Sequence, residues 1–415
     1  MSTLSRRQFL ATSALGVIAG ASRITWGRAL SEQPNLSRLV TGNTAFAWDL
    51  YGQLRNSNQG NLFLSPFSVS TALAMTAAGA KGTTFEEMEK ALHLPADFPA
   101  AFGALLRSIN DPTTDPKKRG YTLTTANALW AQQGYPWRPE YKKLIATEFA
   151  AGLYEVDFVS NTEAARTTIN DWVKKETRDK ITELLSPGTV TAWTRLVLTN
   201  AIYFKGDWLE QFDKQRTKPH PFTRINGSKT EVPLMHRVGS YMYGENEQCQ
   251  VLDLPYVGRR LSMTVILPRT HDGMPALEKE MTSARLTALL GVLRREPEVH
   301  VYLPKFKVET AFTLNDPLQA LGIKAAFGQG ADFSGMHTGG EKLAISTVVH
   351  KAFVDVNEEG TEAAAATGVV VGVTSVRPLP TPKYFRADRP FLFLIRDHQT
   401  GSILFIGRLM DPPKA

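Results

Sequence analysis

The chain has 415 residues, of which 43% are hydrophobic and 21% are charged, and its formal net charge is +7. These values are typical of a globular protein with a sizeable core. The tight basic run Lys117-Lys118-Arg119 has no aromatic residues interleaved with it, so the composition excludes a nucleic-acid platform. We expect that run to be a solvated loop rather than a polyanion site.

The N-terminus resembles a bacterial export signal. Ser5-Arg6-Arg7-Gln8-Phe9-Leu10 is similar to the twin-arginine signal, and a short apolar stretch from Ala11 to Ala21 follows it. That stretch is too short to span a bilayer, as expected for a signal sequence. We therefore expect residues 1–29 to be a signal peptide, cleaved after Ala21 or Ala29, and the protein to reach the periplasm or the extracellular space. A disordered tail with a chance pair of arginines is the alternative.

Cys249 is the single cysteine, which excludes an intramolecular disulfide. It lies in an apolar alternating stretch with Val251 and Leu252, so we expect a buried thiol rather than a nucleophile. The twin-arginine route carries proteins that have already folded. It therefore suits a fold that needs no oxidative machinery outside the cell.

Helical patterns dominate the first part of the chain. Apolar residues from Leu36 to Leu54 recur at helical spacing and predict a helix with one long apolar face. Ser65-Pro66 predicts the start of a second helix. The almost uncharged run that continues to Ala80 predicts that this helix is buried on all sides. Thr84 and Glu87 predict a capping box for a further short helix.

Strand patterns dominate later. Alternation from Tyr121 to Asn127 and the apolar run Leu196–Phe204 predict strands, with a helix around Ile169 between them. Further strands are predicted at Val251–Val257, Leu261–Leu267, Val299–Val308, Leu343–Val356, Phe391–Ile395 and Ile403–Ile406, and a helix at about 315–321. The order lacks regular βαβ alternation, and we find no linker and no internal repeat. One mixed α+β domain is predicted.

Residues 357–383 combine features of a strand and of a surface loop. One alternating set is uncharged, namely Thr361, Ala363, Ala365, Thr367, Val369 and Val371. The other set carries the single charge and comprises Glu362, Ala364, Ala366, Gly368, Val370 and Gly372. This pattern predicts a strand with one face on a core, yet it leads into a proline-rich tail that cannot supply regular sheet donors.

An exposed apolar run of this kind is an aggregation hazard unless it has a place to go. The alternative is that Glu362–Ala366 forms a short surface helix, since glutamate and alanine are good helix formers.

Four motifs, in this order along the chain, resemble those of the serpin family. They are Asn61–Ser68 (NLFLSPFS), Asn200–Trp208 (NAIYFKGDW), Glu358–Glu362 (EEGTE) and Phe385–Ile395 (FRADRPFLFLI). The resemblance extends from about Leu36 to Leu409. It implies an α+β serpin fold in a single domain over residues 30–415, with three β-sheets, about nine helices and an exposed reactive-centre loop at about 358–383.

The resemblance also implies an activity. A serpin is a suicide-substrate inhibitor that traps the acyl-enzyme of a serine protease when its cleaved loop inserts into a five-stranded central sheet. It implies a protein that is not an enzyme, has no cofactor and no metal, and acts as a monomer. The implied partner is a serine protease in a covalent complex, or a papain-like cysteine protease. The basic run does not amount to a clear heparin site.

The resemblance assigns roles to particular residues. The inhibitory hinge matches Glu358, Glu359, Gly360, Thr361, Glu362, Ala363, Ala364, Ala365, Ala366 and Thr367. A charge or a proline among the alternate positions that turn inward would stall insertion, and none is present. A buried polar cluster beneath the opening strands matches Ser65, Ser68, Asn200 and His350, and Trp208 with Glu358 matches the point where the hinge enters. From the sequence alone, His350 is interpreted as a satisfied core histidine rather than a catalytic one.

Counting from Gly360 in the family spacing places the scissile bond at Thr374–Ser375, within one or two positions. The small or β-branched residues at this point suit elastase-like or subtilisin-like proteases. Arg377 precedes Pro378, which blocks ordinary cleavage by a trypsin-like enzyme.

Two other classes of function compete with the inhibitor. A serpin-fold protein could act as a non-inhibitory binding or chaperone-like module, although such members usually carry bulky or charged hinge residues. A hydrolase is disfavoured because the sequence has no G-x-S-x-G, H-E-x-x-H, P-loop or paired-cysteine motif.

Overall fold

The structure is a computed structural model that describes residues 35–110, 119–339, 342–361 and 381–412. The predicted signal peptide at 1–29, the predicted hinge residues from Glu362 to Thr367 and the predicted scissile bond Thr374–Ser375 lie outside the described residues. Within the described ranges, the chain forms nine α-helices, two short 3-10 helices and fifteen strands in two sheets. The predicted α+β class is confirmed.

The smaller sheet has six strands in the order β10-β11-β12-β4-β2-β3. Their bounds are Phe306–Thr313, Thr347–Val356, Gly360–Thr361, Leu196–Asp207, Tyr121–Gln132 and Gly152–Val156. Four of these strands have eight or more residues, β3 has five and β12 has two. Below the level of β12, β4 pairs directly with β11 in parallel register.

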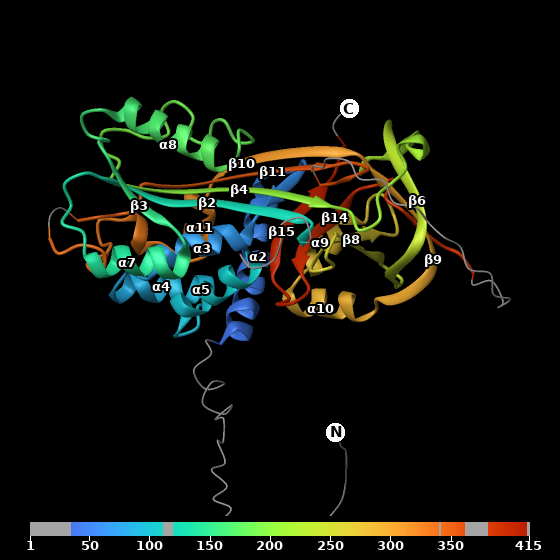
Figure 1. The fold of residues 1–415 in the computed structure, drawn as a ribbon, viewed down its shortest axis with the longest axis horizontal. Coiled ribbons are helices and arrows are strands. Elements are labelled where there is room, and N and C mark those ends of the chain that lie inside the picture. The colour runs from blue at the N-terminus through green and yellow to red at the C-terminus, as the bar shows by residue number, and fades with distance from the viewer. Residues whose placement is uncertain (1–34, 111–118, 340–341, 362–380, 413–415) are drawn as a thin grey trace, which may run out of the picture. The chain divides into compact units, whose positions relative to one another are not determined.

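The sheet lies between helix α8 on one side and the N-terminal helices on the other (Figure 1). Leu198, Ile202 and Phe204 of β4 point into the main core, whereas Val197 and Ala201 pack in a second cluster with α8 (Thr162–Glu176). This alternation follows from the period of a strand, in which successive side chains face opposite sides.

The N-terminal helices cover the other face of the sheet. They are α2 (Leu36–Ser57), α3 (Pro66–Ala77), α4 (Gly82–Leu92), α5 (Phe98–Ile109) and α7 (Pro139–Phe149). The predicted start of α3 is confirmed: Pro66 is its first residue, and the Ser65 side chain accepts a hydrogen bond from the backbone N–H of Ser68. Every residue of α3 is buried, as its uncharged sequence predicts.

The predicted capping box is wrong. Helix α4 begins at Gly82, so Thr84 lies inside the helix rather than at its N-cap. The Thr84 hydroxyl accepts a hydrogen bond from the backbone N–H of Asp332, and Glu87 accepts bonds from the N–H groups of Lys324 and Ala325. Both side chains therefore hold a distant loop instead of capping their own helix.

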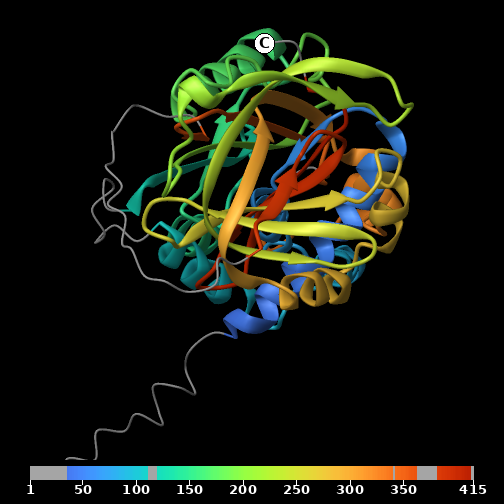
Figure 2. The same cartoon turned by 90° about the vertical axis from the view of Figure 1, so that its right-hand side faces the viewer.

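The larger sheet has nine strands, and Figure 2 turns it toward the viewer. Its strands are β1 (Leu62–Leu64), β5 (Lys218–Thr223), β6 (Lys229–Glu245), β7 (Cys249–Pro255), β8 (Leu261–Pro268), β9 (Arg294–Pro304), β13 (Lys383–Arg386), β14 (Phe391–Asp397) and β15 (Ile403–Leu409). The family resemblance implies three sheets, whereas the described residues form two. Strand β6, with 17 residues, is long enough to pair with both β7 and β9, so strands expected in two separate sheets form one.

The strand predicted at Val299–Val308 is two strands in different sheets. Strand β9 ends at Pro304, and β10 begins at Phe306. Proline has no N–H for a ladder bond, and the N–H of Lys305 donates to the carbonyl of Pro233. The chain changes sheets at this point. The remaining helices are α9 (Met274–Glu280), α10 (Ser283–Gly291) and α11 (Asn315–Ala320).

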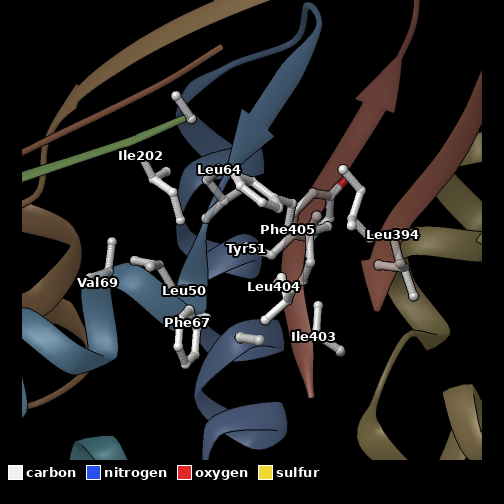
Figure 3. Packing of buried hydrophobic residues seen from close by; sticks show 14 of the residues in the cluster. Leu50, Tyr51, Leu64, Phe67, Val69, Ile202, Leu394, Ile403, Leu404 and Phe405 are labelled. Atoms are coloured by element: carbon white, nitrogen blue, oxygen red, sulfur yellow. The ribbon is translucent and has the colours of Figure 1, made fainter. Parts of the chain in front are cut away.

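The main core forms where β1, β14 and β15 meet α2 and α3 (Figure 3). Leu64, Leu404 and Phe405 are fully buried there. Next to it, the Arg408 guanidinium lies 2.9 Å from the buried carboxylate of Glu278, which also accepts a hydrogen bond from the Tyr51 hydroxyl. Breaking such a buried pair costs about 3–5 kcal/mol, so this contact fixes α9 to the C-terminal strand.

The predicted buried thiol is confirmed. Cys249 has no exposed surface, and burial raises the pKa of its thiol, so the reactive thiolate is disfavoured. None of the helices in the described part of the chain combines the length and apolarity that a membrane crossing requires.

Candidate functional site

The candidate site is the seam between β4 and β11. The two strands pair in parallel over seven residue pairs, from Val197 opposite Thr347 to Tyr203 opposite Phe353. Above this level they separate, and β12 occupies the space between them. Strand β12 is antiparallel to both neighbours, with Thr361 opposite Gly206 on one side and opposite Val356 on the other.

The turn between β11 and β12 is held by its own first residue. The Asn357 side chain accepts hydrogen bonds from the backbone N–H groups of Glu359 (3.0 Å) and Gly360 (3.3 Å). The N–H of Asn357 donates to the carbonyl of Gly360 at 2.9 Å. Such asparagine-centred turns mimic a backbone turn, and this one sends the chain back toward the seam.

The segment after β4 anchors this turn from outside. The Trp208 indole N–H donates to the carbonyl of Asn357 at 3.0 Å, and its backbone N–H donates to the carbonyl of Glu359 at 2.9 Å. The N–H of Phe212 donates to the carbonyl of Glu358 at 2.8 Å. The structure thus brings together Trp208 and Glu358, the two residues predicted to mark the entry of the hinge.

Glu358 is held by its side chain as well. Its carboxylate lies 2.9 Å from the Lys305 ammonium and accepts a hydrogen bond of 2.8 Å from the Thr217 hydroxyl. Burial alone would raise the pKa of the Glu358 carboxyl, but the hydrogen bonds from Lys305, from the backbone and from Thr217 outweigh it and lower the pKa. Glu358 is therefore ionised at neutral pH, and its charge is compensated.

Position 360 tolerates no side chain in this arrangement. A Cβ atom on Gly360 would lie 2.1 Å from the carbonyl oxygen of Gly206 in the neighbouring strand. The next residue, Thr361, is fully buried, and its hydroxyl is 2.8 Å from the hydroxyl of Tyr256. The Tyr256 ring in turn stacks on the Trp208 ring at 4.7 Å. Close backbone approach thus explains the glycine.

A buried polar cluster lies further along the same seam. The structure brings the four predicted residues of this cluster together, each with no exposed surface: Ser65, Ser68, Asn200 and His350. The Ser68 hydroxyl lies 2.6 Å from the Asn200 side-chain nitrogen. The Ser65 hydroxyl donates to the carbonyl of Leu404 at 2.7 Å. The cluster thus ties α3 to the central sheet and to β15.

His350 spans the seam itself. Its Nδ1 contacts the Asn200 side-chain oxygen and lies 3.2 Å from the Asn200 carbonyl, while its Nε2 accepts a hydrogen bond of 3.0 Å from the Ser65 N–H. These partners require a proton on Nδ1 and none on Nε2, so the ring is neutral. Burial lowers the pKa of His350 to about 4, and a backbone hydrogen bond with Asn200 opposes this in part.

Nothing in the cluster is arranged for chemistry. Neither serine hydroxyl is hydrogen-bonded to His350, as a nucleophile and its base would be. Among the residues that the structure describes, no group of three or more His, Cys, Asp or Glu side chains could hold a metal ion. The arrangement holds the seam closed.

Sequence reasoning missed one member of the cluster, Asn127. Its side-chain oxygen lies 2.9 Å from the Ser68 hydroxyl and 2.6 Å from the Asn200 side-chain nitrogen. Asn127, Asn200 and His350 are register neighbours on β2, β4 and β11. The signal was present, because Asn127 shares its strand parity with Tyr121 and Leu123, which face the core.

We predict that His350 makes stability fall in mild acid. The unfolded chain has a histidine pKa of about 6.5, whereas the folded value is about 4. Between these values the unfolded state binds the proton and the folded state does not. The stabilisation is therefore complete above about pH 6.5 and is lost toward pH 4, by on the order of 3 kcal/mol.

The variant His350→Gln should lack this loss, and urea unfolding at pH 7 and pH 4.5 measures it. Some slope of the unfolding free energy against pH will remain, because burial also lowers the pKa of His236. His220→Gln, a partly exposed histidine on β5, is the control and should keep the full slope. A His350→Gln protein with the wild-type slope would contradict the neutral buried ring.

We also predict that Gly360→Ala displaces β12 from the seam, because the new methyl group would overlap the backbone of Gly206. Hydrogen exchange of the Trp208 and Phe212 amides, which donate to the turn, should accelerate by about tenfold or more. Gly330→Ala, where an added Cβ meets nothing within 4 Å, should leave these rates unchanged. Equal rates in the two variants would show that β12 does not need a glycine.

The chain is similar to known proteins of one family. A model of the serpin family, described as serine protease inhibitor, matches residues 41–412. Bovine leukocyte elastase inhibitor is 43% identical over 387 residues, which cover 91% of this chain and 100% of the bovine protein. An uncharacterized serpin-like protein of Thermococcus kodakarensis is 42% identical over 377 residues, covering 90% of this chain and 86% of that protein.

The solved structure of uncleaved ovalbumin is similar with a TM-score of 0.81 at 31% identity, over 90% of this chain and 100% of ovalbumin. The family model covers nearly all of the described residues, and the two relatives match over 86% and 100% of their own length. Sequence and fold therefore agree, and the chain belongs to the serpin family.

Proposed function

We propose that this serpin is a suicide-substrate inhibitor of serine proteases, which traps the acyl-enzyme by inserting its cleaved loop between β4 and β11. Membership of the family supports serine protease inhibition in general. The observation that carries the mechanism is β12, whose two residues already pair with β4 on one side and with β11 on the other. Insertion would extend this short strand along the same seam.

The register of β12 specifies where the next loop residues would lie after insertion. Thr361 is opposite Gly206 and Val356. Advancing two residues along an antiparallel strand brings Ala363 level with Phe204 and Val354, on the face that points into the core. The small, uncharged residues at alternate positions of the loop therefore suit this face.

The same register brings Thr367 level with Asn200 and His350. Insertion must separate these two residues, which are in contact across the closed seam. A hydroxyl at this level can both donate and accept, so Thr367 could replace the hydrogen bonds that the two residues lose. Leaving them unpaired would cost about 1–3 kcal/mol for each buried group.

Strand pairing changes on insertion, but this change alone contributes little free energy. One parallel seam of seven pairs is lost, and two antiparallel seams replace it. Each net hydrogen bond contributes about 1 kcal/mol, whereas ordering each residue costs about 1–2 kcal/mol, so pairing alone nearly cancels. The remaining free energy must come from side-chain burial and from a closed state that is less stable than the inserted one.

Elastase-like or subtilisin-like proteases are the proposed targets. The proposed reactive bond is Thr374–Ser375, with Val373 and Val376 beside it, and small or β-branched residues suit the pockets of these enzymes. Two relatives with more than 40% identity are named leukocyte elastase inhibitor, in cattle and in humans. These names and the loop composition point to the same substrate class.

A matched pair of substitutions tests the mechanism. Ala363→Arg would bury an unpaired charge between Phe204 and Val354, at a cost of several kcal/mol. Glu362→Arg would place the same charge on the opposite face, level with the partly exposed Lys205. Neither substitution removes a contact between described residues, so we expect both variants to fold.

With pancreatic elastase and subtilisin, the wild type and Glu362→Arg should give a covalent complex that survives SDS, and the released peptide should begin at Ser375. Ala363→Arg should be cleaved as an ordinary substrate, with complex yield reduced by about tenfold or more. If the wild type is cleaved by every protease of a panel that includes papain and trypsin, and no complex forms, the protein is a non-inhibitory member of the family.

We propose in addition that the protein is exported through a twin-arginine signal, from the residues Arg6 and Arg7. In a bacterial host, the wild type should be recovered in the periplasm or the medium in a shortened form. The double change Arg6→Lys and Arg7→Lys should leave the full-length chain in the cytoplasm. Equal export of the two proteins would refute this route.

A further inference from the structure

A cavity of about 190 Å³ adjoins the segment that anchors the turn before β12. It is lined by Trp208 and Phe212 of that segment, by Tyr241 of β6, and by the side chains of Arg259, Arg295 and His398. A single water needs roughly 10–15 Å³ of such space. The cavity therefore has room for a small organic molecule, which neither the proposed inhibitory mechanism nor the polar cluster uses.

The cavity lies at an irregularity of the larger sheet. Gly239 of β6 pairs with Val299, but Tyr241 pairs with Glu296, so the register between β6 and β9 shifts around Ser240. Such bulges re-aim side chains and are common next to binding sites. Here the shift accompanies an opening between β6 and the end of β7.

The charged groups around the cavity leave positive charge uncompensated. The carboxylate of Asp253 lies 3.1 Å from His398, and that of Glu210 lies 2.8 Å from Arg237, so both acids already have partners. Arg259 and Arg295 lie on the exposed rim of the cavity, and their guanidinium groups have neither an ion pair nor a hydrogen bond with any residue in the described ranges. The vacant interaction sites are therefore cationic.

A buried hydroxyl adds a second, independent feature. Tyr241 is 4% exposed, and its hydroxyl lies beside the Arg237 side chain, which can only donate to it, so the phenolic O–H has no acceptor among the described residues. Burial raises the pKa of Tyr241 to about 12, so the hydroxyl keeps its proton and remains a donor. A buried donor without an acceptor costs about 1–3 kcal/mol, and a ligand that accepts its hydrogen bond would recover this.

We propose that this cavity binds a small amphipathic organic anion, such as an aromatic or aliphatic carboxylate. The anionic group would interact with Arg259 and Arg295 and accept a hydrogen bond from Tyr241, and the apolar body would pack near Trp208 and Phe212. Arginine suits a carboxylate because its planar donors match the two oxygens. This inference does not depend on the inhibitory mechanism.

Binding should stabilise the contacts on the far side of the same segment. The backbone N–H groups of Trp208 and Phe212 donate to Glu359 and Glu358. A ligand that packs against these two side chains restrains the backbone that carries the donors. We therefore expect ligand to slow hydrogen exchange at residues 208–212, a readout that requires no protease.

Isothermal titration calorimetry with two probe pairs tests the proposal. The anions 1-naphthylacetate and octanoate should bind saturably, whereas uncharged 1-naphthylacetamide and octanol should bind about tenfold more weakly or not at all. Arg295→Gln should weaken binding of an anion by about tenfold, and Tyr241→Phe by about threefold. Arg294→Gln is the matched control, because that neighbour donates to the carbonyls of Gly291 and Leu293 outside the cavity.

Three outcomes would overturn the proposal. The first is no saturable binding of either anion up to about 5 mM. The second is equal affinity for an anion and its uncharged partner. The third is an equal effect of Arg294→Gln and Arg295→Gln, which would indicate general charge attraction rather than this site. Since no outcome involves inhibition, a failure here leaves the proposed function untouched.

Discussion

The parallel pairing of β4 with β11 is the constraint on which the remaining structure depends. Parallel strands cannot be joined by a tight turn, so the two come from distant parts of the chain and adjoin without a covalent link between them. Their contact passes through seven residue pairs and the buried contact between Asn200 and His350. Beyond these pairs, β12 lies between the two strands and is antiparallel to both.

The buried polar side chains at the seam are hydrogen-bonded to one another, and another polar group could replace these bonds. The cluster around His350 joins three strands, β2, β4 and β11, to the N-terminus of α3, and the neutral histidine ring suits a buried site. Because the cluster consists of small polar groups rather than ion pairs, separating the strands exposes no unpaired charge. We propose that the hydroxyl of Thr367, on arriving at the level of Asn200, supplies replacement hydrogen bonds.

Much of the fold could be predicted from the sequence. The helix start at Ser65-Pro66, the strands through Tyr121 and Leu196, and the buried Cys249 follow from local patterns that tertiary contacts reinforce. The cluster was predicted from the family resemblance, because a buried histidine in an apolar strand has no distinctive periodicity.

Other features depended on contacts that no local pattern encodes. Thr84 and Glu87 fit a capping box by spacing, but their partners are more than 200 residues away in the chain. Pro304 ends one strand, yet nothing local says that the next residues join a different sheet. Asn127 and the cavity beside Trp208 could be recognised only from the three-dimensional register of the strands.

We propose above all that the loop after Thr361 is more stable inside the seam than outside it. Thermal unfolding before and after a single cut in residues 362–380 tests this most directly. The unfolding midpoint should rise by more than about 10 °C after cleavage, whereas an unchanged or lower midpoint would show that the loop gains no stability from the seam.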